Sequence, residues 1–127
     1  MHTPDYFLGL DLGQAADWSA LAVLERSRAQ QGQHAWQFGC RGLKRWPLGT
    51  SYPAIVDDVA ELVDKPPLRY AHLVIDGTGV GRPVVDMFAK AMLPVKLAPV
   101  LITAGSKETF DDGYYHVAKV ILTDVLP

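Results

Sequence analysis

The sequence is poor in cysteine and has no long hydrophobic run. Its one cysteine, Cys40, excludes an internal disulfide and a zinc site built from cysteine thiolates. No apolar stretch approaches the roughly 18 residues of a membrane-spanning helix, and the start, MHTPDYF, lacks the apolar core of a secretory signal peptide. We therefore expect a soluble intracellular protein with no membrane partner.

Neither sign of charge dominates. The net charge is −2, so the overall basic excess of many nucleic-acid-binding proteins is absent, while a local basic patch remains compatible with it. The sequence also lacks the pattern Gly-x-x-x-x-Gly-Lys-Ser/Thr, which excludes a P-loop nucleotide-hydrolysing motor within these residues. The chain is 49% hydrophobic and 20% charged, as globular proteins are, and its 127 residues suit a single domain, residues 1–127.

Hydrophobic periodicity predicts a mixed α/β domain. Short apolar or alternating runs indicate strands, and apolar residues at helical spacing indicate helices. The order is β-β-β-α-β-α-β-α, which predicts a mixed five-stranded sheet with flanking helices, a central strand covered on both faces, and a polar loop over 106–115. The predicted strands are 6–11, 20–26, 35–46, 71–75 and 96–105, and the predicted helices are 52–65, 82–92 and 117–126.

Two aspartates, Asp11 and Asp76, each end an apolar predicted strand and precede a glycine-containing turn. Apolar and glycine neighbours indicate that Asp11 is buried. If the two strands are adjacent, the carboxylates lie about 5 Å apart and repel one another. Hard divalent cations such as Mg²⁺ or Mn²⁺ prefer oxygen ligands. The pair therefore predicts a metal site at the carboxyl edge of the sheet. The alternative is that each aspartate hydrogen-bonds the backbone of its own turn.

Three stretches resemble a known family. FLGLDLGQAADWSALAVLER is similar to the opening strand pair of ribonuclease H-like nucleases, and more narrowly of the nuclease part of bacteriophage terminase large subunits. VIDGTGVGRPVVDMF resembles the fourth strand and following helix of that family, and LITAG with VAKVILTDVL resembles the fifth strand and a lysine-led helix. The matching positions are Asp11, Gly13, Asp17, Ser19 and Ala20 in the first stretch and Asp76, Gly77, Gly79 and Gly81 in the second.

The resemblance implies a ribonuclease H-like fold and a metal-dependent DNA endonuclease that cuts viral DNA during packaging. It implies that Asp11 and Asp76 are the catalytic metal ligands of a two-metal site for Mg²⁺ or Mn²⁺, with Asp11 bridging the ions. It further implies double-stranded DNA as substrate, the terminase small subunit and portal as partners, and a phage- or prophage-encoded protein in the bacterial cytoplasm.

One part of the family pattern has no counterpart in this sequence. The family supplies a further acidic residue from a later C-terminal helix, and no position here matches it; Asp111 and Asp112 fall in the predicted loop. We therefore expect the domain to lack the last elements of the fold and to bind metal weakly. An apolar face left bare in this way would favour self-association.

Four basic residues are candidates for contacts with DNA phosphates. Arg82 and Lys107 lie near the predicted site in the topology. Lys44 and Arg45, together with Arg41 and Trp46, form a basic-aromatic cluster on the third predicted strand. For the cluster, a solvated edge strand blunted by charge is an equal alternative.

Two other functions remain open. The first is a nucleotide-binding fragment of the actin and sugar-kinase superfamily, whose phosphate loop also follows a strand-end aspartate and glycine. That superfamily carries Ser or Thr soon after the glycine, where this chain has Gln14. The second is a non-catalytic prophage remnant that keeps the fold without the reaction.

Overall fold

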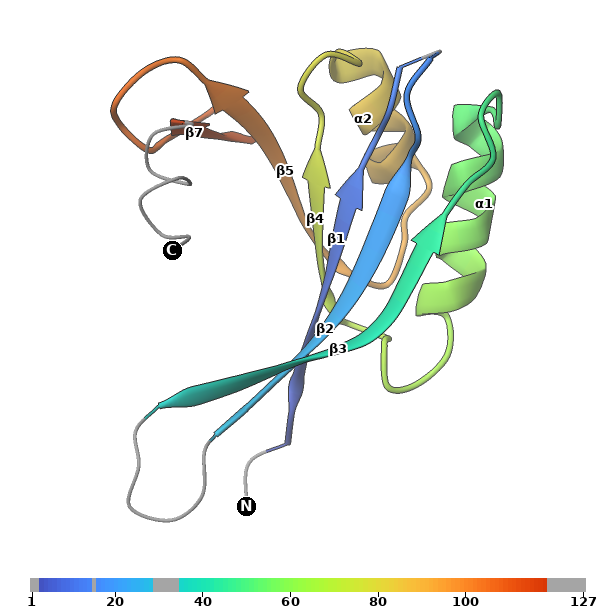
Figure 1. Cartoon of the computed structure of the whole chain (residues 1–127), viewed down its shortest axis with the longest axis vertical. Coiled ribbons are helices and arrows are strands. Elements are labelled where there is room, and N and C mark those ends of the chain that lie inside the picture. The colour runs from blue at the N-terminus through green and yellow to red at the C-terminus, as the bar shows by residue number, and fades with distance from the viewer. Residues whose placement is uncertain (1–2, 15, 29–34, 119–127) are drawn as a thin grey trace.

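Seven strands and two helices make up the described part of the chain, residues 3–14, 16–28 and 35–118 of a computed structural model (Figure 1). The strands form one mixed sheet in the order β3-β2-β1-β4-β5-β7-β6. Along the chain the elements are β1 (Asp5–Asp11), β2 (Ala20–Arg28), β3 (Trp36–Arg45), α1 (Tyr52–Val63), β4 (His72–Asp76), α2 (Arg82–Lys90), β5 (Lys96–Thr103), β6 (Thr109–Asp111) and β7 (Tyr114–Ala118).

The sheet has an antiparallel part and a parallel part, and β1 belongs to both. β1, β2 and β3 form an antiparallel meander, while β1, β4, β5 and β7 run parallel to one another and β6 is antiparallel to β7. The predicted succession of three strands, a helix, a strand, a helix and a strand is confirmed. The predicted strand count of five is wrong, because two further strands follow β5.

The additional strands β6 and β7 form a hairpin where a polar loop was predicted. Asp112 and Gly113 connect them and have positive φ angles of 53° and 83°. Two consecutive left-handed residues match the type I′ turn that Asp-Gly favours between antiparallel strands. The helix predicted from residue 117 is wrong for residues 117 and 118, which belong to β7; the rest of it, from residue 119, lies outside the described residues.

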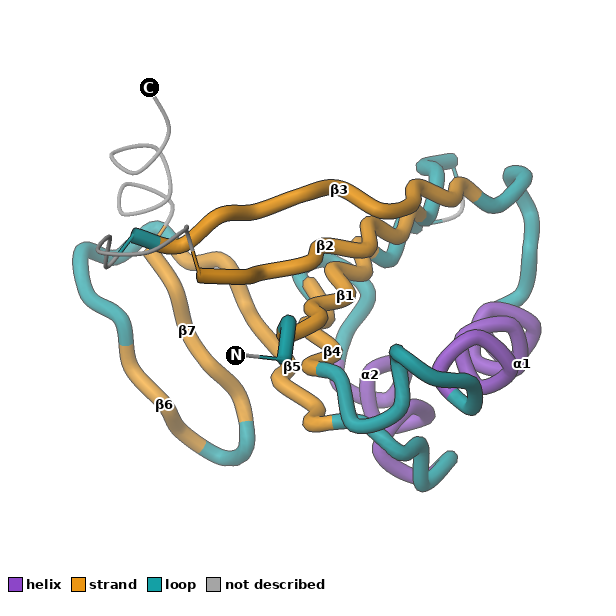
Figure 2. Tube along the Cα trace, turned by 90° about the horizontal axis from the view of Figure 1, so that it is seen from below, coloured by secondary structure: helices purple, strands orange, loops and turns teal. Residues whose placement is uncertain are grey.

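Both helices cover the same face of the sheet, as Figure 2 shows from below. α1 and α2 contribute to one core cluster with alternate residues of the central strands, so the predicted strand covered on both faces is wrong for the described residues. The sheet is strongly curved, with the helix-free face on the inside of the curve (Figure 2). The largest fully buried side chains are Phe88, Leu8, Leu10, Ile55, Leu73, Ile75, Val59, Val63 and Val85.

α1 begins as its sequence indicates. The hydroxyl of Ser51 accepts a hydrogen bond from the backbone N–H of Ala54 at 3.2 Å, and Pro53 occupies the first turn, where its missing N–H has no effect. Among the described residues no helix is long and apolar enough to cross a membrane.

Candidate metal centre

Asp11 and Asp76 lie side by side at the carboxyl ends of β1 and β4. The two strands pair in parallel with Asp11 opposite Asp76, which places both side chains on one face. Adjacent strands are about 4.8 Å apart. Leu10 and Ile75, the preceding residues, are buried under the helices, so the two carboxylates project from the helix-free face. The structure thus brings together the two aspartates selected from the sequence.

The electrostatics of the pair oppose ionisation of Asp11. The residue is exposed, contrary to the expected burial, and Asp76 is half-buried. The pKa of Asp11 is nevertheless raised above its ordinary value, first by desolvation, then by the charge of Asp76 and then by that of Asp17. A raised carboxyl pKa means that the surroundings favour a proton or another positive charge at this position.

Thr78 fixes the orientation of Asp76. Its backbone N–H donates to Oδ1 of Asp76 at 2.9 Å, and its own Oγ1 accepts from the N–H of Ile102 on β5 at 2.8 Å. The turn hydrogen bond expected in the alternative interpretation is therefore present at Asp76. It does not exclude a metal role, because a carboxylate has two oxygens with several lone pairs.

The turn after β1 is tightly packed around Gly13. Its N–H donates to Oγ of Ser19 at 2.9 Å, and its carbonyl accepts from the hydroxyl of Tyr52 on α1 at 2.8 Å. A Cβ atom at this position would lie 2.5 Å from the backbone oxygens of Asp17 and Trp18, closer than real contacts allow. Glycine is therefore required here. The sequence contained no pattern that would have predicted the hydrogen bond from Tyr52 to this turn.

The turns that follow the two aspartates are joined to one another. The side-chain amide of Gln14, in the turn after β1, donates to the carbonyl of Gly79, in the turn after β4. This contact holds together the two turns that bear the carboxylates. Nothing in the sequence pairs these two positions, which are far apart in the chain.

The predicted basic-aromatic cluster is divided between the two faces of the sheet. Nζ of Lys44 lies 3.9 Å from Oδ2 of Asp58 on the helix side, where the buried Trp46 donates to the same oxygen from Nε1 at 2.8 Å. Arg45 lies on the other face and its guanidinium stacks over the ring of Trp18 at 4.0 Å. The prediction that these residues form one cluster on one face of the sheet is therefore wrong.

The remaining two basic candidates lie near β6 and β7. Arg82, the first residue of α2, pairs with Asp112 of the hairpin turn and lies 4.7 Å over the ring of Tyr114. Its charge is already partnered within the protein. Lys107 is exposed in the segment between β5 and β6. Of the four basic candidates, Arg45 is the one that the strand register places on the face of Asp11 and Asp76.

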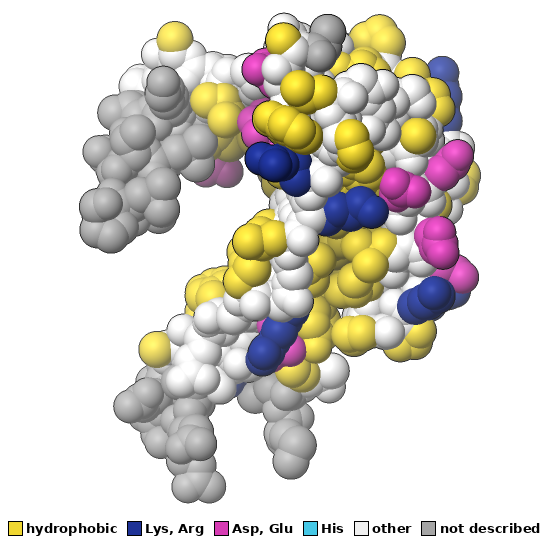
Figure 3. Space-filling model, turned by 45° about the vertical axis from the view of Figure 1, so that its right-hand side comes forward, with side chains coloured by type: hydrophobic (Ala, Val, Ile, Leu, Met, Phe, Trp, Pro, Cys, Tyr) yellow, Lys and Arg dark blue, Asp and Glu magenta, His cyan; other side chains and the backbone are white. Residues whose placement is uncertain are grey.

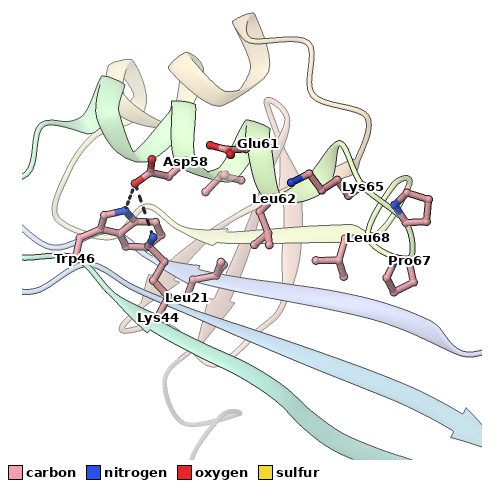
Figure 4. Close-up of a pocket in the computed structure, with 11 residues that line it drawn as sticks. Leu21, Lys44, Trp46, Asp58, Glu61, Leu62, Lys65, Pro67 and Leu68 are labelled. Carbon is pink, nitrogen blue, oxygen red and sulfur yellow. Dashed lines mark hydrogen bonds and ion pairs between the residues drawn. The ribbon is translucent and has the colours of Figure 1, made fainter.

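A hollow of about 500 Å³ lies on the helix side of the sheet, between α1 and the end of β3 (Figure 4). Its floor is apolar, with Leu21, Leu62 and Leu68, while Lys44 and Asp58 interact at its rim. Apolar side chains gather in the middle of this side of the molecule, with basic and acidic ones beside them (Figure 3). The sheet separates this hollow from the aspartate pair, so the hollow is not part of the candidate centre.

The pair supplies two carboxylates rather than a complete cage. Among residues 3–14, 16–28 and 35–118, no group of three or more His, Cys, Asp or Glu side chains could hold a metal ion. A divalent cation at Asp11 and Asp76 would therefore complete its shell with water or with substrate oxygens, as Mg²⁺ commonly does.

Comparison with known proteins identifies the fold. No protein-family model matches the sequence, and no curated protein matches it significantly. A solved structure of the large terminase nuclease from thermophilic phage G20c with bound zinc matches at 22% identity and a TM-score of 0.50, over 76% of this chain and 48% of that one. The chain has the fold of a large terminase nuclease.

A second structure supports this assignment. The same phage nuclease with bound magnesium matches at 22% identity and a TM-score of 0.51, covering 76% of this chain and 44% of that one. This chain therefore spans less than half the length of the G20c nuclease chain in either structure. Its seven-stranded mixed sheet with two helices is compatible with the ribonuclease H-like nuclease fold.

Proposed function

We propose that this chain is the nuclease domain of a phage terminase large subunit and that Asp11 and Asp76 hold Mg²⁺ or Mn²⁺ for the hydrolysis of DNA. The observation that carries the proposal is the in-register carboxylate pair, with the raised pKa of Asp11. The terminase nuclease fold supports it, as does the fact that the G20c nuclease was solved with bound zinc and with bound magnesium.

The residues present fit a divalent cation. Asp11 and Asp76 offer hard oxygen donors on one face, and positive charge between them would offset the desolvation and the repulsion by Asp76 that raise the pKa of Asp11. When bound, such cations supply an activated hydroxide and stabilise the leaving oxygen of a phosphodiester. In a two-metal arrangement Asp11 would be the bridging ligand, as the resemblance to ribonuclease H-like nucleases implies.

The other residues of the centre position the carboxylates. Thr78 orients Asp76 through its N–H, and Gln14 ties the turn after Asp11 to the turn after Asp76. Arg45, on the same face, is available to contact a phosphate of the substrate. In the proposed setting the substrate is double-stranded viral DNA, the partners are the terminase small subunit and portal, and the reaction takes place in the cytoplasm of the infected bacterium.

Nicking of a supercoiled plasmid tests the proposal. With Mn²⁺ we expect the wild type to convert it to open-circular and linear forms, and EDTA to stop the reaction. Asp11→Asn and Asp76→Asn should each reduce the rate by about 100-fold or more, because each removes charge from a metal site. Asp57→Asn, an identical change on the exposed surface of α1, should leave the rate unchanged. Cleavage that persists in an Asp11→Asn, Asp76→Asn double variant would refute the proposal.

A metal-binding domain without catalysis is the second candidate. It is favoured because Asp11 and Asp76 are only two ligands, and no group of three or more His, Cys, Asp or Glu side chains among the described residues could hold a metal ion. Binding of Mn²⁺ that depends on Asp11 and Asp76, together with no cleavage by the wild type, would select it. The nucleotide-binding alternative gains no support, because the amide of Gln14 is bonded to Gly79 in the turn where a phosphate would have to enter.

A further inference from the structure

Residues on seven strands form one transverse row across the helix-free face, with the aspartate pair near its middle. Asp76 is in register with Val100 of β5, which is in register with Tyr115 of β7, and Tyr115 is opposite Phe110 of β6. In the other direction the register continues from Asp11 to Ala20 of β2 and from there to Arg45 of β3. Because residues paired across strands share a face, the whole row faces the same side.

Planar groups end the row on both sides of the carboxylates. Tyr115 and Phe110 contact each other with ring centroids 4.6 Å apart and are 39% and 63% exposed. On the opposite side Trp18 is 44% exposed and carries the guanidinium of Arg45 stacked on its ring at 4.0 Å. Exposed aromatic rings in the same row as two carboxylates are not a packing requirement of the core, which lies on the other face.

The spacing of the row suits a polynucleotide strand. Tyr115 and Arg45 each stand two strands from the nearer aspartate, about 10 Å away. The curvature of the sheet turns β2 and β3 on one side and β6 and β7 on the other around the centre of this face (Figure 2). Small side chains leave room between them: hollows of about 450 Å³ and 260 Å³ share Gly9 and Asp11 in their walls.

Unpaired bases are the groups that such rings recognise. Every base has a π-face that stacks on an aromatic side chain, whereas in a duplex the base faces are stacked on each other. A guanidinium that lies over an aromatic ring still has N–H donors that a phosphate can accept from, and Arg45 lies over Trp18 in this way. A second copy of this chain is a poorer occupant, because a symmetric interface would bury two mutually repelling carboxylate pairs together.

We propose that this row binds a nucleic-acid strand whose bases are unpaired beside the phosphate at Asp11 and Asp76. The strand crosses the sheet, its bases stack on Phe110 and Tyr115, and Arg45 contacts its backbone. The inference rests on the proposed nuclease function and specifies that the double-stranded DNA substrate is locally unpaired where it meets Asp11 and Asp76.

Fluorescence anisotropy tests binding separately from cleavage. Labelled oligothymidylate and a labelled hairpin duplex are titrated with the wild type and with the Asp11→Asn, Asp76→Asn variant, which keeps the shape of the site and needs no metal to relieve its repulsion. We expect both proteins to bind the single strand more tightly than the duplex. A Phe110→Leu, Tyr115→Leu variant should bind the single strand at least about fivefold more weakly, the effect of losing one stacked base.

Two further variants make the test decisive. Trp18→Leu, on the opposite end of the row, should also weaken binding. Phe38→Leu is the matched control, since Phe38 is 64% exposed on the same face but lies about 20 Å along the strands from the row, beside Arg26. Circular dichroism and light scattering establish that each variant is folded and report its mass.

The possible results are distinct. Equal binding of duplex and single strand, or an effect of Phe38→Leu as large as that of Phe110→Leu, Tyr115→Leu, would overturn the proposal. So would a dimer that Phe110→Leu, Tyr115→Leu dissociates while its nucleic-acid affinity stays unchanged. If the wild type binds the single strand through Phe110 and Tyr115 but cuts no DNA, the result would support strand binding along the row and refute the nuclease function. Metal-dependent cleavage by the wild type, with single-strand binding that Phe110→Leu, Tyr115→Leu does not weaken, would support the nuclease function and refute binding of a strand along the row.

Discussion

At the scale of single residues, the fold holds Asp11 and Asp76 together against their own repulsion. The register of β1 and β4 fixes their spacing, and hydrogen bonds through Thr78 and Gln14 hold the two turns. Without a cation, the ionised pair destabilises the native state, whereas in the unfolded chain the two aspartates are far apart.

Asp11→Asn should therefore stabilise the metal-free protein at neutral pH. The native pKa of Asp11 is raised, so its favourable contribution is fully present below the unfolded pKa of about 3.9 and is lost as the pH rises through the higher native value. We expect a gain of less than about 1 kcal/mol in the free energy of unfolding, because solvent screens exposed charges. Urea unfolding in EDTA at pH 7 and pH 4 measures it.

The gain should shrink as the pH falls from 7 to 4, because the wild-type carboxyl takes up its proton over this range. Asp57→Asn serves as the control, because it makes the same substitution on the exposed surface of α1, away from the aspartate pair. An Asp11→Asn variant that is less stable than the wild type at pH 7 would show that the carboxylate contributes a favourable contact instead.

The turn after β1 depends on Gly13 for steric reasons. A methyl group there would approach two backbone oxygens to 2.5 Å, whereas at Gly9 on the helix-free face a Cβ meets nothing within 4 Å. Gly13→Ala should lower the free energy of unfolding by about 1–3 kcal/mol, the usual range for overpacking. Gly9→Ala should be neutral or slightly stabilising. Equal urea midpoints for the two variants would contradict the tight turn.

At the scale of elements, the sequence predicted those parts in which pattern and local chemistry agree. α1 was predicted correctly from the helical spacing of its apolar residues and from the cap at Ser51; the buried ones are Ile55, Val56, Val59 and Val63. Periodicity did not predict β6 and β7, because the two strands have only three and five residues and every residue of β6 is exposed. The sequence Asp112–Gly113 does indicate a hairpin turn, but the neighbouring acidic residues led to the prediction of a polar loop.

The turn of that hairpin is open to a direct test. Gly113→Ala places a Cβ at a φ of 83°, which should cost about 1–2 kcal/mol. Asp112→Asn removes the charge that pairs with Arg82 but keeps a residue that tolerates left-handed backbone, so it should destabilise the protein less than Gly113→Ala does. Hydrogen exchange should show faster exchange of the amides of β7 in Gly113→Ala, with those of β4 unchanged. Uniform acceleration of both strands would mean that the hairpin does not unfold locally.

Side-chain placement explains which site residues could be predicted. Strand ends are visible in a sequence, and parallel pairing brings Asp11 and Asp76 to one edge. The direction of a side chain depends on the register with a partner strand, which the sequence does not display. Because successive residues of a strand point to opposite faces, Lys44 and Arg45 could not both lie on the face of the aspartates, and the register places Arg45 there. The pairing of Arg82 with Asp112 depends on the turn between β6 and β7, which the pattern did not predict.

At the scale of the whole molecule, the candidate metal centre lies where two parts of the sheet meet. Asp11 belongs to the antiparallel meander that β1 closes, and Asp76 belongs to the parallel part that follows α1. A cation bound by both carboxylates would link the two parts across their shared boundary. Because such a site forms only when both parts are folded together, metal binding and global stability are coupled.

Mn²⁺ should therefore raise the melting temperature of the wild type, and EDTA should reverse the change. Free Mn²⁺ at about tenfold above its dissociation constant adds about 1.4 kcal/mol, since the ion binds the native state and not the separated aspartates. Asp11→Asn and Asp76→Asn should each abolish the shift, whereas Asp57→Asn should keep it. Calorimetry should give the same ranking, with weak binding by the wild type because two carboxylates leave most of the ion's shell to water. If the double variant Asp11→Asn, Asp76→Asn binds Mn²⁺ as well as the wild type, the boundary between β1 and β4 is not the metal site.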